Sequence, residues 1–262
     1  MHGAGLVGPK LQHVRNLWPI SQYVNDRKGN EPVIQGLIFD KDGTLFDFNA
    51  TWGAWAGMMI AQEAAGDPDR MAQLADAMGY DLAAKKFLPG SVVIASTVEE
   101  TAAAMLSALP GETLDTLIPR MNAAAMKVDQ IAAVPLLPFF DDLKSRGLRL
   151  GIATNDTEAP ARDHLLKAGV EGHFDFIAGY DSGHGAKPGS GQLQAFCAMT
   201  GLDPINCAMI GDSTHDLHAG RAAGMTTIGV LTGPALKEEL SPLADVVLPN
   251  IGHVPDWLDA QP

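Results

Sequence analysis

Short apolar runs that end in polar or glycine-rich turns recur through the second half of the chain. They lie at residues 148–153, 174–178, 207–210, 226–231 and 246–248, with a comparable run at 33–39. Runs of this length without polar alternation are typical of strands buried on both faces. Helix-like stretches separate them, at residues 159–168, 191–200, 215–223 and 235–240. This alternation predicts an α/β fold with a parallel sheet that helices cover on both faces.

A different pattern fills the segment from residue 51 to about residue 133, where Ala, Met and Leu recur at helical spacing. It predicts an all-helical domain inserted after the first strand. Trp52, Trp55 and Met59 fall on one face of its first helix, which favours packing inside a small bundle over a cofactor site. Pro135 and Pro138 mark the return to the sheet domain, as a hinge or linker would.

The domain boundaries follow from these two patterns. We expect a sheet domain built from residues 33–48 and 136–262, and a helical domain over residues 49–135. Residues 1–32 mix Gly, Pro, Asn and charged residues without a sustained period, so we expect an irregular extension and assign it no function.

Composition narrows the classes of partner. The 262 residues carry 18 Lys and Arg against 31 Asp and Glu, a formal net charge of −13, which disfavours binding to nucleic acid or to an anionic membrane. The sequence shows neither a membrane-spanning apolar run nor a signal peptide, so a cytoplasmic location is the default expectation. Cys197 and Cys207 have no metal-ligand spacing and predict buried, reduced thiols.

Polar side chains follow several of the predicted strands. They are Asp40 and Asp42, Thr154 and Asn155, Asp212 and Asp216, with Lys187 in the loop after Asp181. Ligands of open α/β sheets bind beyond the carboxyl ends of the strands. Carboxylates at two ends, a hydroxyl with an amide at another and one lysine are the parts that phosphoryl transfer requires.

Each residue type suggests a role. A carboxylate at Asp40 can attack phosphorus only if a divalent cation cancels the charge repulsion, and Asp40, the backbone carbonyl of Asp42 and Asp212 suffice as ligands for magnesium. Asp42 is placed to protonate the leaving group and then to accept a proton from water. Lys187 supplies a compact positive charge.

The remaining candidates contact the substrate or support the metal. Thr154 and Asn155 offer hydrogen bonds to the phosphoryl oxygens, and Gly43 and Thr44 are further candidates for substrate binding. Asp216 either contacts the metal through a water or orients Lys187.

Together these motifs resemble those of the haloacid dehalogenase superfamily, and within it the phosphoglycolate-phosphatase-like enzymes with a helical cap. Residues 40–44 look like the first motif, Thr154 like the second, Lys187-Pro188 like the third and residues 211–216 like the fourth. The resemblance covers about residues 35–249. It implies a Rossmann-like core, a mobile cap that closes over the substrate, and magnesium as cofactor.

We therefore expect a magnesium-dependent phosphatase that hydrolyses a small phosphate monoester, such as a glycolate, sugar or nucleoside phosphate, through an aspartyl phosphate. Monomer and homodimer both remain open. Lys85, Lys86 and Ser91 are the candidates for specificity groups in the cap. Strand alternation is expected to point Lys41 away from Asp40 and Asp42.

Several alternatives remain. A phosphomutase is the strongest, because it would keep the same core. A phosphonate hydrolase would need a cap lysine, and Lys85, Lys86 and Lys127 are available. Asp42 argues against a dehalogenase, whose ester to carbon needs no proton donor. A signalling receiver domain would lack the helical insertion, and a phosphate-binding protein without catalysis is also possible.

Overall fold

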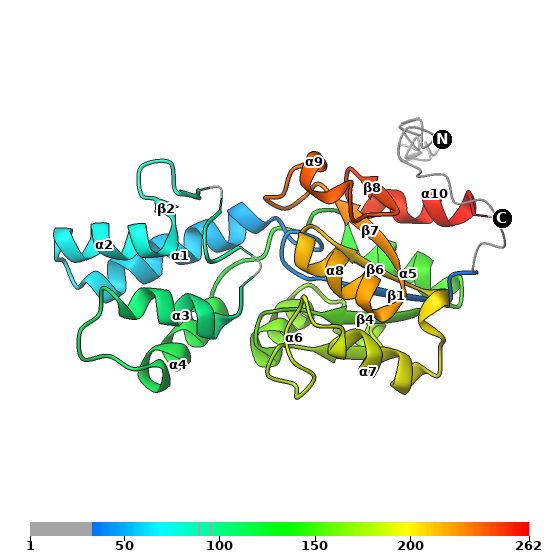
Figure 1. Ribbon diagram of the computed structural model, residues 1–262, viewed down its shortest axis with the longest axis horizontal. Coiled ribbons are helices and arrows are strands. Elements are labelled where there is room, and N and C mark those ends of the chain that lie inside the picture. The colour runs from blue at the N-terminus through cyan, green and yellow to red at the C-terminus, as the bar shows by residue number, and fades with distance from the viewer. Residues whose placement is uncertain (1–32, 89, 95, 262) are drawn as a thin grey trace, which may run out of the picture.

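A six-stranded parallel sheet lies at the centre of the larger part of the molecule (Figure 1), in a computed structural model that describes residues 33–88, 90–94 and 96–261. The strand order is β5-β4-β1-β6-β7-β8. The strands are β1 (Gly36–Phe39), β4 (Arg149–Ala153), β5 (Phe176–Ala178), β6 (Cys207–Gly211), β7 (Thr226–Val230) and β8 (Val246–Leu248). The α/β prediction is confirmed, and the predicted extension over residues 1–32 lies outside the described residues.

The sheet reverses its chain order at β1, and this is where a site is expected. Phe39 pairs with Ile152 of β4 on one side and with Ile210 of β6 on the other. The polar residues that follow these three strands therefore meet at one edge of the sheet, at the point where ligands bind in open α/β folds.

Helices cover both faces of the sheet because successive side chains of each strand point to opposite sides. On one face, Leu37 and Phe39 belong to a core that also includes residues of α5, α6 and α10. On the other face, Ile38 packs in a core with residues of α7 and α8, and Leu240 of α9 packs against Leu217. The bounds are α5 (Leu136–Ser145), α6 (Glu158–Lys167), α7 (Gly191–Thr200), α8 (Thr214–Ala223), α9 (Lys237–Leu240) and α10 (Val254–Asp259).

The segment between β1 and α5 forms a helical insertion with its own hydrophobic core, at the left in Figure 1. Its helices are α1 (Phe48–Ala64), α2 (Pro68–Met78), α3 (Val98–Leu106) and α4 (Leu114–Ala125). The insertion is helical as predicted but not all-helical, because β2 (Tyr80–Asp81) and β3 (Lys86–Phe87) form a short antiparallel hairpin. Trp55 and Met59 are buried in this core, as expected.

Two linkers connect the insertion to the sheet, and they lie side by side. The backbone N–H of Asp47 donates to the carbonyl of Ile131 at 2.8 Å, and that of Ala133 donates to the carbonyl of Leu45 at 2.8 Å. Pro135 lies at the N-cap of α5 and Pro138 within its first turn. The exact domain boundaries stay a prediction, but the separate cores of the sheet and the insertion divide the chain in the same way.

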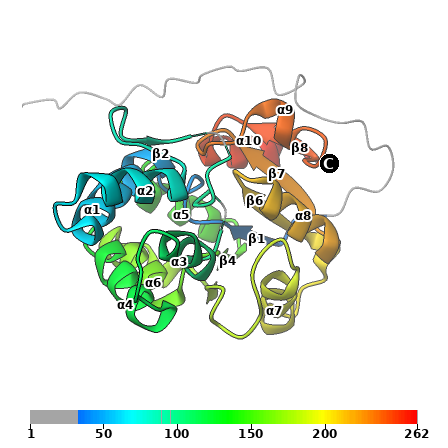
Figure 2. The same ribbon diagram turned by 60° about the vertical axis from the view of Figure 1, so that its left-hand side comes forward.

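Figure 2, turned by 60°, shows the insertion overhanging the end of the sheet at which β1, β4 and β6 finish. Cys197 and Cys207 are buried and unbridged, as predicted. In the described part of the chain, no helix combines the length and the apolar character needed to cross a membrane.

Candidate active site

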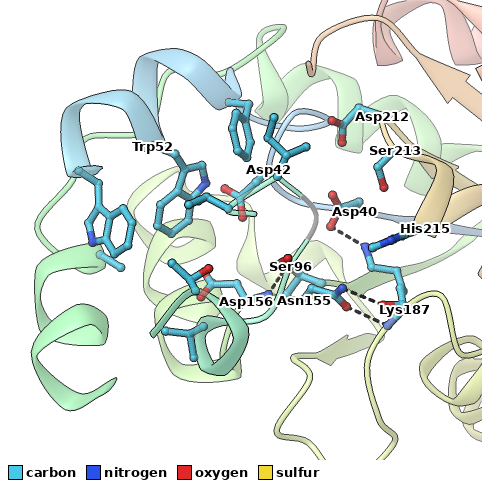
Figure 3. Close-up of a pocket in the computed structure, with 18 of the residues that line it drawn as sticks. Asp40, Asp42, Trp52, Ser96, Asn155, Asp156, Lys187, Asp212, Ser213 and His215 are labelled. Atoms are coloured by element: carbon cyan, nitrogen blue, oxygen red, sulfur yellow. Dashed lines mark hydrogen bonds and ion pairs between the residues drawn. The ribbon is translucent and has the colours of Figure 1, made fainter. Parts of the chain in front are cut away.

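A buried ion-pair cluster occupies the sheet edge at β1 (Figure 3). The Nζ atom of Lys187 donates to Oδ1 of Asp40 at 2.8 Å and to Oδ1 of Asp216 at 2.6 Å. All three side chains are buried. The two carboxylates hold the pKa of Lys187 above its usual value although burial by itself would lower it. Lys187 therefore remains charged and fixes the position of Asp40.

Asp216 is positioned by the start of α8. Its Oδ2 atom accepts hydrogen bonds from the backbone N–H of Ser213 at 3.0 Å and from its hydroxyl at 2.7 Å. This capping box orients the carboxylate toward Lys187. A Cβ atom at Gly211 would overlap the Asp216 side chain, so only glycine fits there. The contact with Lys187 agrees with the orienting role that the sequence suggested for Asp216, and that role stays a prediction.

Asp40, Asp212 and Asp216 form a group that can hold a metal ion. One carboxylate oxygen from each lies within 4.8 Å of the others, and all three residues are buried. Burial raises the pKa of Asp40 to about 7, and neighbouring Asp216 and Asp42 act in the same direction. Burial also raises the pKa of Asp212 well above its usual value. Three mutually repelling carboxylates with hard oxygen donors fit a divalent cation.

Gly43 and Thr44 lie behind Asp212. The hydroxyl of Thr44, which is fully buried, donates to Oδ1 of Asp212 at 3.2 Å. Gly43 has a positive φ of 82° and approaches Asp212 so closely that a Cβ atom would overlap its carboxylate. Neither residue lines the pocket. The structure thus gives both residues a supporting position, and their predicted contact with substrate stays a prediction.

Thr154 and Asn155 follow β4 and line the pocket beside Lys187. The side-chain amide of Asn155 donates to the carbonyl of Lys187 at 2.9 Å and accepts from its N–H at 2.8 Å. Asn155 therefore fastens the Lys187 loop to the end of β4. Thr154 also lines the pocket, and its carbonyl accepts a hydrogen bond from the side-chain amide of Gln192 at 3.0 Å. Substrate binding by Asn155 and Thr154 stays a prediction.

The prediction that Lys41 points away from both aspartates is wrong. Lys41 is fully buried, and its Nζ lies 2.8 and 2.6 Å from the two carboxylate oxygens of Asp42 and 3.3 Å from Oδ2 of Asp156. The chain leaves the strand at Phe39, so the alternation of side chains no longer applies at residue 41. Asp42 itself lines the pocket, whereas Lys41 does not. Lys41 therefore contacts the Asp42 carboxylate from the side that faces the protein interior.

The same lysine reaches the insertion through His164. Lys41 Nζ donates to Nδ1 of His164 at 3.1 Å, so Nε2 carries the proton that it shares with the carbonyl of Ala125 at 3.0 Å. Burial, together with the charge of Lys41, lowers the pKa of His164 to about 4. The Lys41 ammonium also lies 5.5 Å from the ring centre of Trp52 in α1. This network ties the site to both ends of the helical insertion.

The cluster opens into a pocket between the sheet and the insertion. The predicted specificity groups of the cap do not line it among the described residues: Lys85 and Lys86 are exposed, and Ser91 is buried with its hydroxyl donating to the carbonyl of Met78 at 2.6 Å. Lys127 is exposed and outside the pocket as well. Lining residues that sequence reasoning missed include Trp52, Ser96, Asp156, Ser213 and His215, which Figure 3 labels.

The comparison with protein families places the chain in one family. The model of haloacid dehalogenase-like hydrolases matches residues 34–224, which include the sheet edge and the helical insertion. The chain therefore belongs to the haloacid dehalogenase-like hydrolases, and the resemblance seen in the sequence is confirmed.

Two of the named relatives illustrate the similarity to phosphatases. A phosphoglycolate phosphatase of Neisseria meningitidis is 37% identical over 91 residues, which are 35% of this chain and 39% of the relative. The pyrophosphatase PpaX of Bacillus pumilus is 25% identical over 207 residues, 77% of this chain and 85% of the relative. The match to the phosphoglycolate phosphatase spans about two fifths of that protein, so its substrate does not carry over directly.

Solved structures share the fold with different chemistries. A HAD phosphatase from Thermococcus onnurineus has a TM-score of 0.61 at 17% identity, covering 87% of this chain and 99% of the other. The L-2-haloacid dehalogenase from Xanthobacter autotrophicus has a TM-score of 0.59 at 17% identity, covering 88% and 100%. The fold alone does not separate phosphate esters from carbon–halogen bonds, and the residues of the site must do so.

Proposed function

We propose that this protein is a magnesium-dependent phosphatase that hydrolyses a small phosphate monoester through a phosphorylated Asp40. The observation that carries the proposal is the placing of Asp40, held by Lys187, at the base of a pocket that Asp42 also lines. The named phosphatases among the relatives agree with it.

In the first step, a carboxylate oxygen of Asp40 attacks phosphorus and the bond from phosphorus to the ester oxygen breaks. The leaving oxygen takes a proton from Asp42, whose side chain lies in the same pocket. Lys187 and the hydroxyl of Thr154 are the groups of this chain that neutralise and orient the phosphoryl oxygens. The alcohol is released and the phosphoryl group stays on Asp40.

In the second step, water attacks the phosphorus atom of the aspartyl phosphate. Asp42, now a carboxylate, takes the proton from this water, and the bond from Asp40 to phosphorus breaks. Inorganic phosphate leaves and both carboxyl groups return to their starting states. Asp42 thus donates a proton in the first step and accepts one in the second. Cleavage of a phosphate ester needs such a group, whereas a halide leaves without a proton, so Asp42 favours phosphate esters over carbon–halogen bonds.

Asp40 and Asp212 would hold magnesium directly, and Asp216, already paired with Lys187, would contribute through a water. When bound, magnesium would offset the charge repulsion between Asp40 and the phosphoryl oxygens. The fit rests on the three buried carboxylates themselves: burial raises the pKa of Asp40 and of Asp212, and a bound divalent cation would offset this cost of keeping them charged.

The described cap residues give a phosphonate hydrolase no support, since Lys85, Lys86 and Lys127 all lie outside the pocket. A phosphomutase would use the same core, and it differs in its product: an isomeric phosphate ester in place of inorganic phosphate.

The test is release of inorganic phosphate from a panel of phosphate monoesters and pyrophosphate, with and without magnesium. Wild type is compared with Asp40→Asn and with Asp76→Asn, a control at an exposed position of α2. We expect release only with magnesium, its loss in Asp40→Asn and its retention in Asp76→Asn. Full activity of Asp40→Asn would contradict the proposal. An isomerised ester would indicate a mutase, and binding without turnover a phosphate-binding protein.

A further inference from the structure

The pocket has a polar base and an apolar wall. The base is formed by residues that follow the strands, with the carboxylates and Lys187 described above. The wall comes from the helical insertion, between α1, α3, α4 and the segment before α3. Its apolar lining residues are Phe48, Trp52, Trp55, Val93, Ile94, Val98, Met121 and Ala125.

Positive charge is confined to the base. Among the described lining residues, Lys187 is the sole lysine or arginine, and it is already shared between Asp40 and Asp216. Three further carboxylates, those of Asp42, Asp156 and Asp212, also line the pocket. A second anionic group on the substrate would thus meet an apolar wall and these carboxylates, and the described lining offers no further lysine or arginine to replace its lost hydration.

We propose, on the basis of the phosphatase function above, that the substrate is the phosphate monoester of an uncharged, largely apolar alcohol of the alkyl or aryl kind. The phosphate group sits at the polar base, and the carbon skeleton lies against Trp52, Ile94 and Val98 of the wall. Burial of carbon against these side chains provides the affinity for the alcohol part.

The wall offers few polar contacts for that alcohol. Ser96, Thr101 and Asn122 are its polar members, and the side-chain oxygen of Asn122 already accepts a hydrogen bond from the Thr157 hydroxyl at 2.8 Å. Such a lining suits one hydroxyl or ether oxygen on the skeleton. It does not suit the many hydroxyl groups of a phosphosugar, each of which needs a partner when buried.

The experiment measures kcat/KM with magnesium for linear alkyl phosphates from ethyl to hexyl phosphate, and for phosphoglycolate, glucose 6-phosphate and pyrophosphate. Alkyl esters share similar leaving groups, so the series reports on binding of the chain. We expect kcat/KM to rise about fourfold for each methylene that becomes buried, as expected for its transfer from water. A preference of tenfold or more for phosphoglycolate or the phosphosugar over hexyl phosphate would overturn the inference.

Two matched variants locate the wall. Val98 is the first residue of α3 and lines the pocket, whereas Leu114 is the first residue of α4, is 37% exposed and does not. We expect Val98→Lys to lower kcat/KM for hexyl phosphate at least about tenfold, the loss of roughly two buried methylenes, and to raise it for phosphoglycolate. Leu114→Lys should leave both unchanged. Equal effects of both variants would contradict a wall at Val98.

Binding separates a failure of this inference from a failure of the phosphatase function. Hexylphosphonate, methylphosphonate and phosphonoacetate resist hydrolysis, and their affinities can be measured by calorimetry in the presence of magnesium. Tightest binding of hexylphosphonate supports the inference even if no ester is hydrolysed. If esters are hydrolysed but phosphonoacetate binds tightest, the phosphatase function stands and the apolar substrate class is wrong.

Discussion

Asp40 is buried at the end of β1, where the loss of water disfavours the charged form of its side chain. Burial raises its pKa to about 7, and this outweighs the opposing effect of Lys187. In the unfolded chain the side chain has its ordinary pKa of 3.8. Below about pH 4 it is protonated in both states. As pH rises toward 7, the unfolded chain releases the proton and the folded protein keeps it, so stability is lost as pH rises.

The Asp40→Asn variant tests whether ionisation of Asp40 lowers stability as pH rises, because asparagine cannot ionise. In metal-free buffer we expect the variant to gain stability relative to wild type between pH 4 and pH 8, by at least about 1.4 kcal/mol, the free energy of one pKa unit. The measurement is urea unfolding with a chelator, with Asp76→Asn as control. A wild-type-to-variant difference that does not change with pH would contradict the assigned pKa.

Lys41 provides a second prediction. It holds Asp42 at 2.8 and 2.6 Å but does not line the pocket. Lys41→Met should therefore lower kcat at least about tenfold, since a displaced proton donor loses part of a contribution of about 10²–10⁴, while KM stays within about twofold. Lys127→Met, at an exposed cap position, is the control.

Folding of the Lys41 variant is checked by circular dichroism, because removing one partner of a buried ion pair costs about 3–5 kcal/mol. If Lys41→Met does not fold, Asp156→Asn weakens the same network from its other carboxylate. Because Asp156 lines the pocket, its variant is judged by the loss of kcat alone. A rise in KM with unchanged kcat would contradict a role for Lys41 in positioning Asp42.

Individual residues were predictable from the sequence where their chemistry is tied to a strand end. Five predicted residues line one pocket: Asp40, Asp212, Asp216, Thr154 and Lys187. The first four follow strands that pair in parallel, which brings them together, whereas Lys187 lies in the loop between β5 and α7. Lys41 and Asp156 were not predictable as partners. Their ion pair depends on how the loop turns after β1, and no local pattern reports that.

Among the secondary-structure elements, α8 connects fold and site. Its N-cap Ser213 bonds Asp216, and Asp216 bonds Lys187. Ser213→Ala should cost about 1 kcal/mol of stability, as for other N-caps, and should also lower kcat severalfold because Asp216 loses its support.

Asp67→Ala is the matched control for this helix cap. Asp67 caps α2 by accepting from the backbone N–H groups of Asp69 and Arg70, far along the chain from the site. The same loss of stability with unchanged kcat is expected there, by urea unfolding and steady-state kinetics. If both variants lower kcat equally, stability and not the orientation of Asp216 is the cause.

Elements with a clear period were predicted closely: α7 and β8 match their predicted ranges, and α6 begins and ends one residue earlier than predicted. The helix α5 was not predicted because its Pro138 suggested a break. Pro138 lies in the first turn, where backbone N–H groups need no partner within the helix. The hairpin strands β2 and β3 have only two residues each, which is too short for an alternation of polar and apolar residues to be seen in the sequence.

The sheet domain and the helical insertion contribute different parts of the pocket. Groups that would bind phosphate come from the sheet domain, and the apolar wall comes from the insertion.

We therefore expect Ile94→Ala to raise KM for an alkyl phosphate about fivefold, from lost apolar contact, and to leave inhibition by inorganic phosphate unchanged. Leu82→Ala, at an exposed position of the insertion outside the pocket, is the control. Equal weakening of ester and phosphate would contradict this division.

The arrangement of the two parts was predictable only in outline. The insertion after β1 followed from the change in hydrophobic period, but its orientation over the sheet depends on contacts between distant residues. The hydrogen bond of Thr157 with Asn122 and that of His164 with Ala125 are examples. Because the wall residues were not known to face the site, the sequence pointed to Lys85 and Lys86 as specificity groups, and both lie outside the pocket.

One measurement addresses the covalent role of Asp40. The Asp42→Asn variant, which should hydrolyse the phosphoenzyme slowly, is mixed with magnesium and an ester that the wild type turns over, quenched in acid and digested for mass spectrometry. We predict one added phosphoryl group on the peptide that contains Asp40, and none when Asp40→Asn is combined with Asp42→Asn. A phosphoryl group on any other residue, or turnover by Asp40→Asn at the wild-type rate, would contradict the mechanism.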